Sequence, residues 1–480
     1  MILYNTSSMN SYKSCFVLGI GGSGMSSLAH ILIDRGIQTI GYDKGSNKQT
    51  SQLVDRGILF FQTADAFIES GVVPEMAVHS SAIKDHPLLD WLRDKGIPIF
   101  HRSEVMHSFF AEKMTISIAG SHGKTTTTAM VSQIFLDLNL DPSIMIGGET
   151  DILNGRGGRW GQGPYGVYES DESDGTFLNH LADYRILTNI DDDHLDHYIN
   201  RDNLTDSFAS YLNTKDGKKS IAYIGDSGIC EALKKDIDVT NIILVGERSD
   251  FEILKSTIPH SLDQFHRFNY IEKGFDSWKL ISDEISISYS VPFYGDHYRI
   301  NASLAIALGL ELGLDPQSIQ NSISKYKGVK RRMEVLGSCN GASIIDDYGH
   351  HPTEVKAVLT GFMEAKEKGN IDRVIVIFQP HRFTRTQNLF KDFANELKIA
   401  DKIFILPIYS AGEEPISGVS SNLIFDELIQ SKPDTCLLQG DIDKDCKQIL
   451  PFLQNNNVLI TLGAGSVRSW GERLIENYST

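Results

Sequence analysis

The sequence has few cysteines, and they lack the spacing of disulfide frameworks or zinc sites. Five cysteines are scattered through 480 residues without a CxxC pair, which indicates reduced thiols in a cytoplasmic protein. Long uncharged hydrophobic runs are missing as well, and the apolar stretch before the first glycines is too short for a signal peptide. We therefore expect neither a membrane span nor a secretory leader.

Basic residues are scarce relative to acidic ones. The chain carries 62 Asp and Glu against 45 Lys and Arg, a formal net charge of −17 at pH 7. This balance makes nucleic acids and anionic membrane surfaces poor partners. We expect small-molecule substrates instead, with local cations wherever a substrate is anionic, and a monomer or weak dimer.

The chain is too long for one hydrophobic core, and alternating strand and helix patterns divide it into three α/β blocks. A prior of about 150 residues per domain agrees with this division. We place the domains at residues 1–112, 113–328 and 329–480. In the third block, the apolar runs Arg373–Phe378 and Asn457–Leu462 are typical of strands that are buried on both faces of a parallel sheet.

The second block opens with a phosphate-binding motif, ISIAGSHGKTTTTAM, which predicts a strand, a glycine turn and the start of a helix. Gly120 and Gly123 would let backbone N–H groups close on a phosphate. Lys124 adds a positive charge, and Thr125 offers a hydroxyl to Mg²⁺ at the helix N-terminus. Ile118 stands where the general P-loop has a glycine, so this is a shortened variant. A chance GKT at the end of a strand is the alternative.

The first block carries another glycine-rich turn, GIGGSG at residues 19–24, with Asp43 after it. This pattern matches the dinucleotide-binding fingerprint, and three interpretations stay open: NAD(P), a UDP-linked ligand, or a structural tight turn. Glycines let the backbone approach a pyrophosphate, while the acid meets a polar group of the nucleoside. The P-loop in the same chain favours a sugar nucleotide, because an oxidoreductase has no use for ATP and Mg²⁺.

Two acidic segments follow strands in the second block. The first, YESDESDGTF, contains Glu169, and the second, TNIDDDHLDHY, contains His194. Acids at the carboxyl ends of strands face the ligand crevice of an α/β sheet, and their oxygens suit Mg²⁺. A solvated acidic loop is the alternative for either segment alone, but two such segments beside a P-loop favour a metal site. Spacing alone leaves the role of His194 open.

The third block concentrates histidines and arginines where strands end. The segment IIDDYGHHPTE is expected to place five side chains in a turn: Asp346, Asp347, Tyr348, His350 and His351. Beyond another strand, FQPHRFTRTQNLF brings His381, Arg382 and Arg385, while Arg331 and Arg332 precede the block. If the second segment is helical, its two arginines share a face and form a fork for carboxylate or phosphate. Surface arginine pairs are the alternative.

Taken together, the motifs closely resemble those of the Mur ligase family. In order from residue 19 to 466 they include GIGGSGMS, AGSHGKTTTT, ESDESDGTF, TNIDDDHLDHY, GDHYRINA, GVKRRME, DDYGHHPTE, FQPHRFTRT and LGAGS. The resemblance implies an N-terminal Rossmann-like domain for a UDP sugar, a central P-loop ATPase domain, and a C-terminal Rossmann-like α/β domain. It also implies a reaction in peptidoglycan precursor synthesis: ATP would phosphorylate the lactyl carboxylate of UDP-N-acetylmuramate, and the amine of L-alanine would attack the acyl phosphate.

Carried over motif by motif, the resemblance also implies site residues. ATP would be bound by Gly120, Ser121, His122, Gly123, Lys124, Thr125, Thr126, His297, Asn301, Arg331 and Asp346. The sugar nucleotide would be bound by Gly19, Gly21, Gly22, Ser23, Gly24, Asp43, Ser80 and Ser81. Mg²⁺ would be held by Thr125, Glu169 and His194. The amino-acid and acyl side would be held by Tyr348, His350, His351, Arg382 and Arg385. The catalytic residues would be Lys124, His194, His381, Arg382 and Arg385.

Other functions stay open. A ligase that adds a whole tripeptide to the same sugar nucleotide is the close alternative, although the two acidic motifs favour the addition of alanine. An oxidoreductase built on GIGGSG would leave the P-loop and the acidic segments without a role. A regulatory or transport ATPase would hydrolyse ATP in the absence of sugar nucleotide and amino acid.

Overall fold

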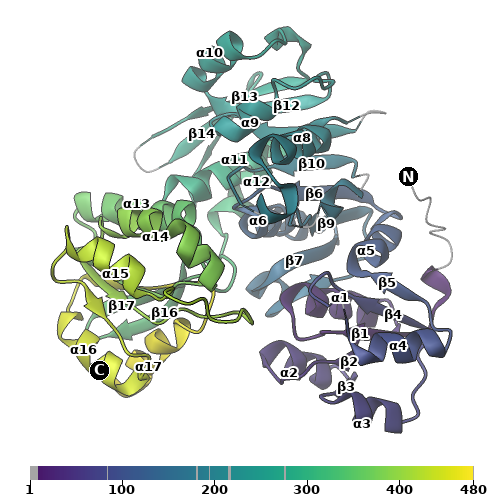
Figure 1. Cartoon of the computed structure of the whole chain (residues 1–480). Coiled ribbons are helices and arrows are strands. Elements are labelled where there is room, and N and C mark those ends of the chain that lie inside the picture. Colours follow the sequence, from purple (N-terminus) through teal and green to yellow (C-terminus); the bar gives the residue numbers. More distant parts are fainter. Residues whose placement is uncertain are drawn as a thin grey trace. The chain divides into compact units, whose positions relative to one another are not determined.

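The computed structural model describes residues 9–83, 85–173, 175–179, 182–193, 195–214, 218–274 and 277–478 (Figure 1). The chain divides into two compact units. The first unit holds everything up to Val291 together with Ile300–Lys327, and the second holds Pro292–Arg299 and everything from Gly328. Two sheets belong to the first unit and one to the second. The domain boundaries expected after residues 112 and 328 stay predictions.

The first sheet has the strand order β3-β2-β1-β4-β5, and all neighbouring strands are parallel. Its elements are β1 (Ser14–Leu18), α1 (Ser23–Asp34), β2 (Gln38–Tyr42), α2 (Lys48–Asp55), β3 (Leu59–Phe61), α3 (Ala64–Glu69), β4 (Met76–His79), α4 (Pro87–Asp94), β5 (Ile99–His101) and α5 (Arg102–Phe110). The strand order reverses between β1 and β4, which is where ligands bind in open α/β sheets. The GIGGSG turn follows β1 and Ser80 follows β4, so both lie at this point.

The second sheet is mixed, with the order β15-β14-β13-β12-β11-β10-β6-β9-β7-β8. Its strands are β6 (Met114–Ala119), β7 (Ser143–Thr150), β8 (Arg156–Arg159), β9 (Tyr165–Glu169), β10 (Tyr184–Leu187), β11 (Lys219–Tyr223), β12 (Ile242–Glu247), β13 (Arg267–Glu272), β14 (Trp278–Ser282) and β15 (Ile285–Tyr289). The helices of this region are α6 (Lys124–Asp137), α7 (Leu195–Tyr198), α8 (Arg201–Leu212), α9 (Ser227–Ala232), α10 (Arg248–Thr257), α11 (Asp296–Glu311) and α12 (Pro316–Ser324). Strand β6 is parallel to both β10 and β9, so the P-loop and the two acidic segments leave the same edge of the sheet.

The third sheet has the order β16-β17-β21-β18-β19-β20, with β16 antiparallel and the rest parallel. Its elements are β16 (Glu334–Cys339), β17 (Ala342–Asp347), α13 (Pro352–Glu367), β18 (Arg373–Phe378), α14 (Phe383–Leu397), β19 (Lys402–Ile405), α15 (Asn422–Ile429), β20 (Cys436–Leu437), α16 (Ile442–Ile449), β21 (Asn457–Leu462) and α17 (Arg468–Tyr478). Strands β18 and β21 have the predicted bounds and lie side by side inside the sheet. The three sheets confirm the predicted α/β fold class.

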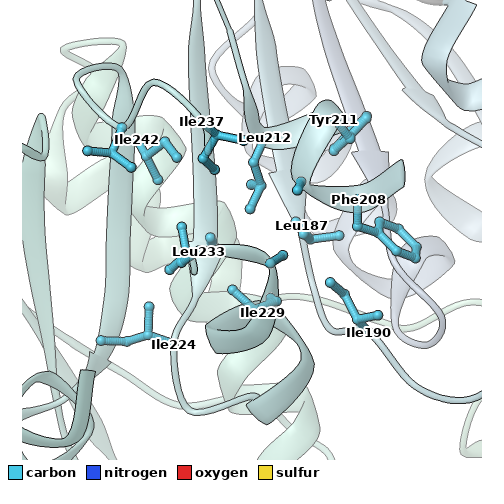
Figure 2. Close-up of a cluster of buried hydrophobic side chains, with 14 of the residues drawn as sticks. Leu187, Ile190, Phe208, Tyr211, Leu212, Ile224, Ile229, Leu233, Ile237 and Ile242 are labelled. Carbon is cyan, nitrogen blue, oxygen red and sulfur yellow. The ribbon is translucent and has the colours of Figure 1, made fainter. Parts of the chain in front are cut away.

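A buried apolar cluster in the first unit supports the segment that follows β10. Figure 2 shows the cluster, to which α8, α9 and the neighbouring strands contribute, among others, Phe208, Ile229 and Ile242. Ile190 is 3% exposed and belongs to this cluster. Burial of a side chain of this size contributes about 1.5–3 kcal/mol, so the cluster fixes the backbone on both sides of Ile190.

Two expectations about thiols and membranes can be compared with the fold. None of the five cysteines, all of which are described, forms a disulfide. Within the described part of the chain, helices that combine the length and the apolarity required to span a bilayer are lacking.

Candidate active site

The P-loop is a tight turn between β6 and α6, as its sequence predicts. Gly120 has φ 131° and Gly123, which caps α6, has φ 83°, values that side chains with a Cβ rarely adopt. A Cβ on Gly120 would lie 2.1 Å from Thr188 Oγ1, and one on Gly123 would lie 2.8 Å from Asn301 Oδ1. At both positions the backbone lies too close to a neighbouring side chain to leave room for a Cβ.

The segment after β10 holds the P-loop in shape. Asn189 accepts hydrogen bonds from the N–H groups of Ser121 (3.1 Å, to its carbonyl) and His122 (2.9 Å, to Oδ1), and its Nδ2 donates to the carbonyl of His122 at 2.9 Å. The ring of His122 lies against Asp191, with 3.1 Å between Nε2 and Oδ2. The sequence gives one signal for the role of Asn189, which is its position after a strand that neighbours β6.

Lys124 is already engaged in this structure. Its Nζ donates to the carbonyls of Gly120 (2.5 Å) and Ser121 (3.0 Å), and it forms an ion pair of 2.7 Å with Glu172 Oε1. Burial acts to lower the pKa of Lys124, but the carboxylates of Glu172, Asp171 and Glu169 outweigh burial and raise it. Lys124 is therefore a firmly protonated cation inside the turn. Glu172, whose side chain is 3% exposed, was not predicted to have this role.

The residues expected to hold a metal are described in part. Thr125 lies in the first turn of α6 and is partly exposed, and Thr126 beside it is buried. Glu169 is the last residue of β9, pairs in register with Ile118 of β6, and accepts a hydrogen bond of 2.8 Å from the N–H of Gly147. His194 lies outside the described residues.

The expected sugar-nucleotide residues gather at the edge of the first sheet. Gly22 caps α1, so Ser23 and Gly24 form its first turn, where backbone N–H groups lack intrahelical acceptors. Asp43 Oδ2 accepts the N–H of Gly21 at 2.9 Å. In this structure the carboxylate of Asp43 therefore holds the backbone of the glycine turn. The spacing between the turn and Asp43 in the sequence does not reveal this contact. Gly19 has φ 76° and starts the turn.

Ser80 and Ser81 follow β4 at the same edge. The hydroxyl of Ser81 lies 3.0 Å from Nε2 of His101. His101 ends β5 and caps α5, and its backbone N–H donates to Glu104 at 2.6 Å. The two segments are thereby tied together next to the GIGGSG turn.

In the second unit, the structure corrects the expectation that Asp346 and Asp347 lie in a turn, because both are residues of strand β17. Asp346 is fully buried and is surrounded by Arg331 (3.2 Å), Arg468 (3.5 Å) and the hydroxyl of Thr461 (2.7 Å). Because two of these groups are cations and the third donates a hydrogen bond, the carboxylate of Asp346 can be buried near the end of strand β17.

Arg331 is likewise occupied within the second unit. Its guanidinium donates to the carbonyls of Gly463 (2.7 Å), Ala464 (3.2 Å) and Gly465 (3.1 Å) and lies over the ring of Tyr348, 4.9 Å from its centre. Arg331 therefore holds the loop after β21 in place through these hydrogen bonds. Its expected contact with ATP stays a prediction.

The arginines and histidines near β18 form one cluster. The rings of His350 and His381 lie 5.6 Å apart, and His381 stacks on Tyr409. Burial lowers the pKa of His381 to about 4, helped by His350, Arg385 and Arg382. Near neutral pH His381 is therefore an uncharged hydrogen-bonding group, while the arginines carry the positive charge.

The condition under which Arg382 and Arg385 would share a helical face is not met, because α14 starts at Phe383 and Arg382 is its N-cap residue. Arg382 has φ 70° and ψ 140°, its N–H donates to the carbonyl of Tyr409 at 2.8 Å, and the residue is exposed. Its backbone is fixed while its side chain faces solvent. Arg385 lies inside the first turn of α14.

Three further expected residues lie on helices. His351 caps α13, and His297 lies in the first turn of α11, where burial and then Arg332 lower its pKa to about 4. Asn301, also on α11, belongs to the first unit and packs against Gly123. The structure thus brings Asn301 to the P-loop, and His297 and His351 belong to the second unit.

Known proteins with the same features are numerous. Family models match three stretches of the chain: residues 16–114 (Mur ligase family, catalytic domain), 165–309 (Mur ligase middle domain) and 331–465 (Mur ligase, glutamate ligase domain). The chain is 35% identical over 470 residues to the UDP-N-acetylmuramate--L-alanine ligase of Agrobacterium fabrum, covering 95% of both chains. It is 34% identical to that of Geotalea daltonii, covering 96% of both.

Solved structures agree. The UDP-N-acetylmuramate-alanine ligase of Thermotoga maritima matches with a TM-score of 0.76 at 25% identity, covering 96% of this chain and 98% of that one. A murein peptide ligase of Psychrobacter arcticus shares the fold, with a TM-score of 0.69 at 20% identity and coverage of 97% and 98%. With three family models in order and full-length relatives at this identity, the chain belongs to the Mur ligase family.

Proposed function

We propose that this protein is an ATP-dependent ligase that joins L-alanine to the lactyl carboxylate of UDP-N-acetylmuramate, giving UDP-N-acetylmuramoyl-L-alanine, ADP and phosphate. The observation that carries the proposal is the match over 95–96% of the chain to curated relatives named for this ligation. The P-loop, with Lys124 protonated inside it, supports the use of ATP. This step belongs to the synthesis of peptidoglycan precursors.

The chemistry needs an activated carboxylate, because hydroxide or oxide is a poor leaving group. An oxygen of the lactyl carboxylate attacks the γ-phosphorus of ATP, the bond to the β–γ bridging oxygen breaks, and ADP leaves. The neutral amine of alanine then attacks the carbonyl carbon of the acyl phosphate. The tetrahedral intermediate expels phosphate, and the nitrogen loses a proton to give the amide. Lys124 would stabilise the charge on the transferring phosphoryl group.

Mg²⁺ is part of the proposal, and the side chains that the structure describes fit it. Thr125 presents a hydroxyl in the first turn of α6, and Glu169 presents a carboxylate at the end of the neighbouring strand β9. Both are oxygen donors, which Mg²⁺ prefers. Thr125, Glu169 and His194 would hold the ion, which would neutralise charge on the ATP phosphates when bound.

The second unit holds the residues that we propose to bind the amino acid and the acyl group. The exposed side chain of Arg382, with Arg385, would bind carboxylates of alanine or of the acyl substrate. Tyr348, His350, His351 and His381 would surround them, with the rings of His350 and His381 uncharged near neutral pH because burial lowers the pKa of both. We also propose that the protein acts in the cytoplasm as a monomer or weak dimer, without nucleic-acid or membrane partners, consistent with its charge of −17.

Phosphate release by the purified protein tests this function. With ATP, Mg²⁺ and UDP-N-acetylmuramate present, we expect release to depend on added L-alanine. The murein tripeptide serves as the competing acceptor, and preference for it would identify the peptide-adding ligase instead. Release that needs neither sugar nucleotide nor acceptor would indicate a simple ATPase and overturn the proposal.

A further inference from the structure

Arg102 lies against the GIGGSG turn, although no motif singles it out. It is the first residue of α5, directly after β5, so it leaves the same edge of the first sheet as the turn after β1. A Cβ built on Gly24 would lie 2.2 Å from Nη1 of Arg102. The guanidinium therefore occupies the space beside Gly24, at the first turn of α1.

The start of α5 is fixed independently of any ligand. His101, which caps the helix, is held by Glu104 and Ser103 from within α5 (2.6 and 2.7 Å) and lies 3.0 Å from the hydroxyl of Ser81. Ser81 follows β4, the strand beside β1. The backbone of Arg102 is therefore ordered before a substrate arrives, which lowers the entropic cost of binding.

Among the described residues, the guanidinium of Arg102 has Asp171 as its one acidic partner. Nη2 lies 3.2 Å from Oδ2 of Asp171, and the side chain of Arg102 is 21% exposed. Its Nε is buried, and within the described residues it has no hydrogen-bond partner.

We propose that Arg102 binds the diphosphate of the sugar nucleotide beside Gly24, and that Asp171 neutralises this cation while the site is free. The planar fork of arginine matches phosphate oxygens in a way that a lysine ammonium does not. A chain with 17 excess negative charges needs such a local cation to hold a dianion. The inference rests on the proposed function, since it takes a UDP-linked substrate as the ligand of the turn.

Binding measured without ATP and Mg²⁺ tests the assignment, because no catalytic step is then involved. Calorimetry would compare wild type, Arg102→Met, Arg102→Lys and the control Arg93→Ala, whose arginine is exposed and pairs locally with Asp90. We expect Arg102→Met to weaken binding of UDP-N-acetylmuramate and of UDP about 10- to 100-fold, and Arg102→Lys to recover part of the loss. Arg93→Ala should bind like wild type.

Uridine, titrated by NMR, separates a role in binding phosphate from a role in folding. It lacks the diphosphate, so its affinity should be the same for wild type and Arg102→Met, whereas a damaged site would lose uridine as well. Equal affinity of wild type and Arg102→Met for UDP would overturn the assignment. So would a loss confined to UDP-N-acetylmuramate, which would place Arg102 on the lactyl carboxylate. Wild type that binds neither nucleotide would instead contradict the proposed function.

Discussion

Glu172 illustrates how a residue can serve the site by acting on another residue. Glu172 is buried and pairs with Lys124 at 2.7 Å. This ion pair keeps Lys124 protonated, although the burial of the lysine disfavours its charge. Glu172→Gln keeps the shape of the side chain and removes its negative charge. The effect of burial on Lys124 is then less opposed, so the pKa of Lys124 should fall. The pH dependence of acylation of Lys124, followed by peptide mass spectrometry, measures this shift.

A matched control for this change is Glu252→Gln, since Glu252 is exposed on α10. The control should leave the titration of Lys124 as in wild type. An unchanged titration in Glu172→Gln would show that Glu172 does not set the charge state of the lysine.

Arg382 offers a prediction about the acceptor side of the reaction. Its backbone is held by Tyr409 while its side chain is exposed, so Arg382→Ala removes a cation without opening the core. We expect the KM for alanine to rise, or kcat to fall, about 10- to 100-fold, with little change in the KM for ATP. Arg373→Ala, at the exposed start of β18, is the control. Equal losses for both substrates would contradict the placement.

His350 predicts a pH dependence of stability in the second unit. Burial, with Arg385 and Arg332, lowers the pKa of His350 to about 4 although Glu354 acts to raise it. An unfolded histidine titrates near pH 6.5, so the folded state binds fewer protons between these values. The stability contributed by neutral His350 is therefore complete above pH 6.5 and is lost as the pH falls toward 4.

The comparison of wild type with His350→Gln isolates this contribution. Thermal midpoints measured from pH 7 to 4 should show wild type losing stability relative to the variant. Parallel curves, or an NMR titration of His350 near pH 6.5, would contradict the inference.

At the scale of elements, the close packing of helix α1 against strand β8 depends on a single glycine of β8. A Cβ on Gly158 of β8 would lie 1.9 Å from the carbonyl oxygen of Ser27 in α1, and the Ser27 hydroxyl donates to the carbonyl of Ile146 at 2.8 Å. Gly158→Ala must therefore separate the helix from the sheet. We expect a loss of about 1–3 kcal/mol, seen as a lower thermal midpoint. Gly45→Ala, with no neighbour within 4 Å, should be close to neutral.

The elements also show what local sequence could and could not predict. Strands β18 and β21 were predicted with the correct bounds because their continuous apolar runs suit a strand buried on both faces. The end of β17 was not predicted, because burial of Asp346 in the strand depends on Arg331, Thr461 and Arg468, and the last of these is 122 residues away in the sequence. The start of α14 depends in the same way on the hydrogen bond from Arg382 to Tyr409.

At the scale of the whole molecule, the order of the motifs was sufficient to predict three α/β sheets and the family. The site residues that we predicted from the motifs are those expected to bind substrates. Asn189 and Glu172 lie inside these motifs, but their contacts with His122 and Lys124 were not predicted, and neither was the contact of Arg102 with Asp171. Such contacts are long-range, so no window of sequence contains both partners.

The central claim is that ATP activates the lactyl carboxylate as an acyl phosphate, and transfer of an oxygen isotope tests it most directly. UDP-N-acetylmuramate labelled with ¹⁸O at both carboxylate oxygens would be turned over with ATP, Mg²⁺ and L-alanine. We predict that each released phosphate carries one ¹⁸O atom and that the amide carbonyl keeps the other, both measured by mass spectrometry. Unlabelled phosphate, released at the rate of product formation, would contradict the account.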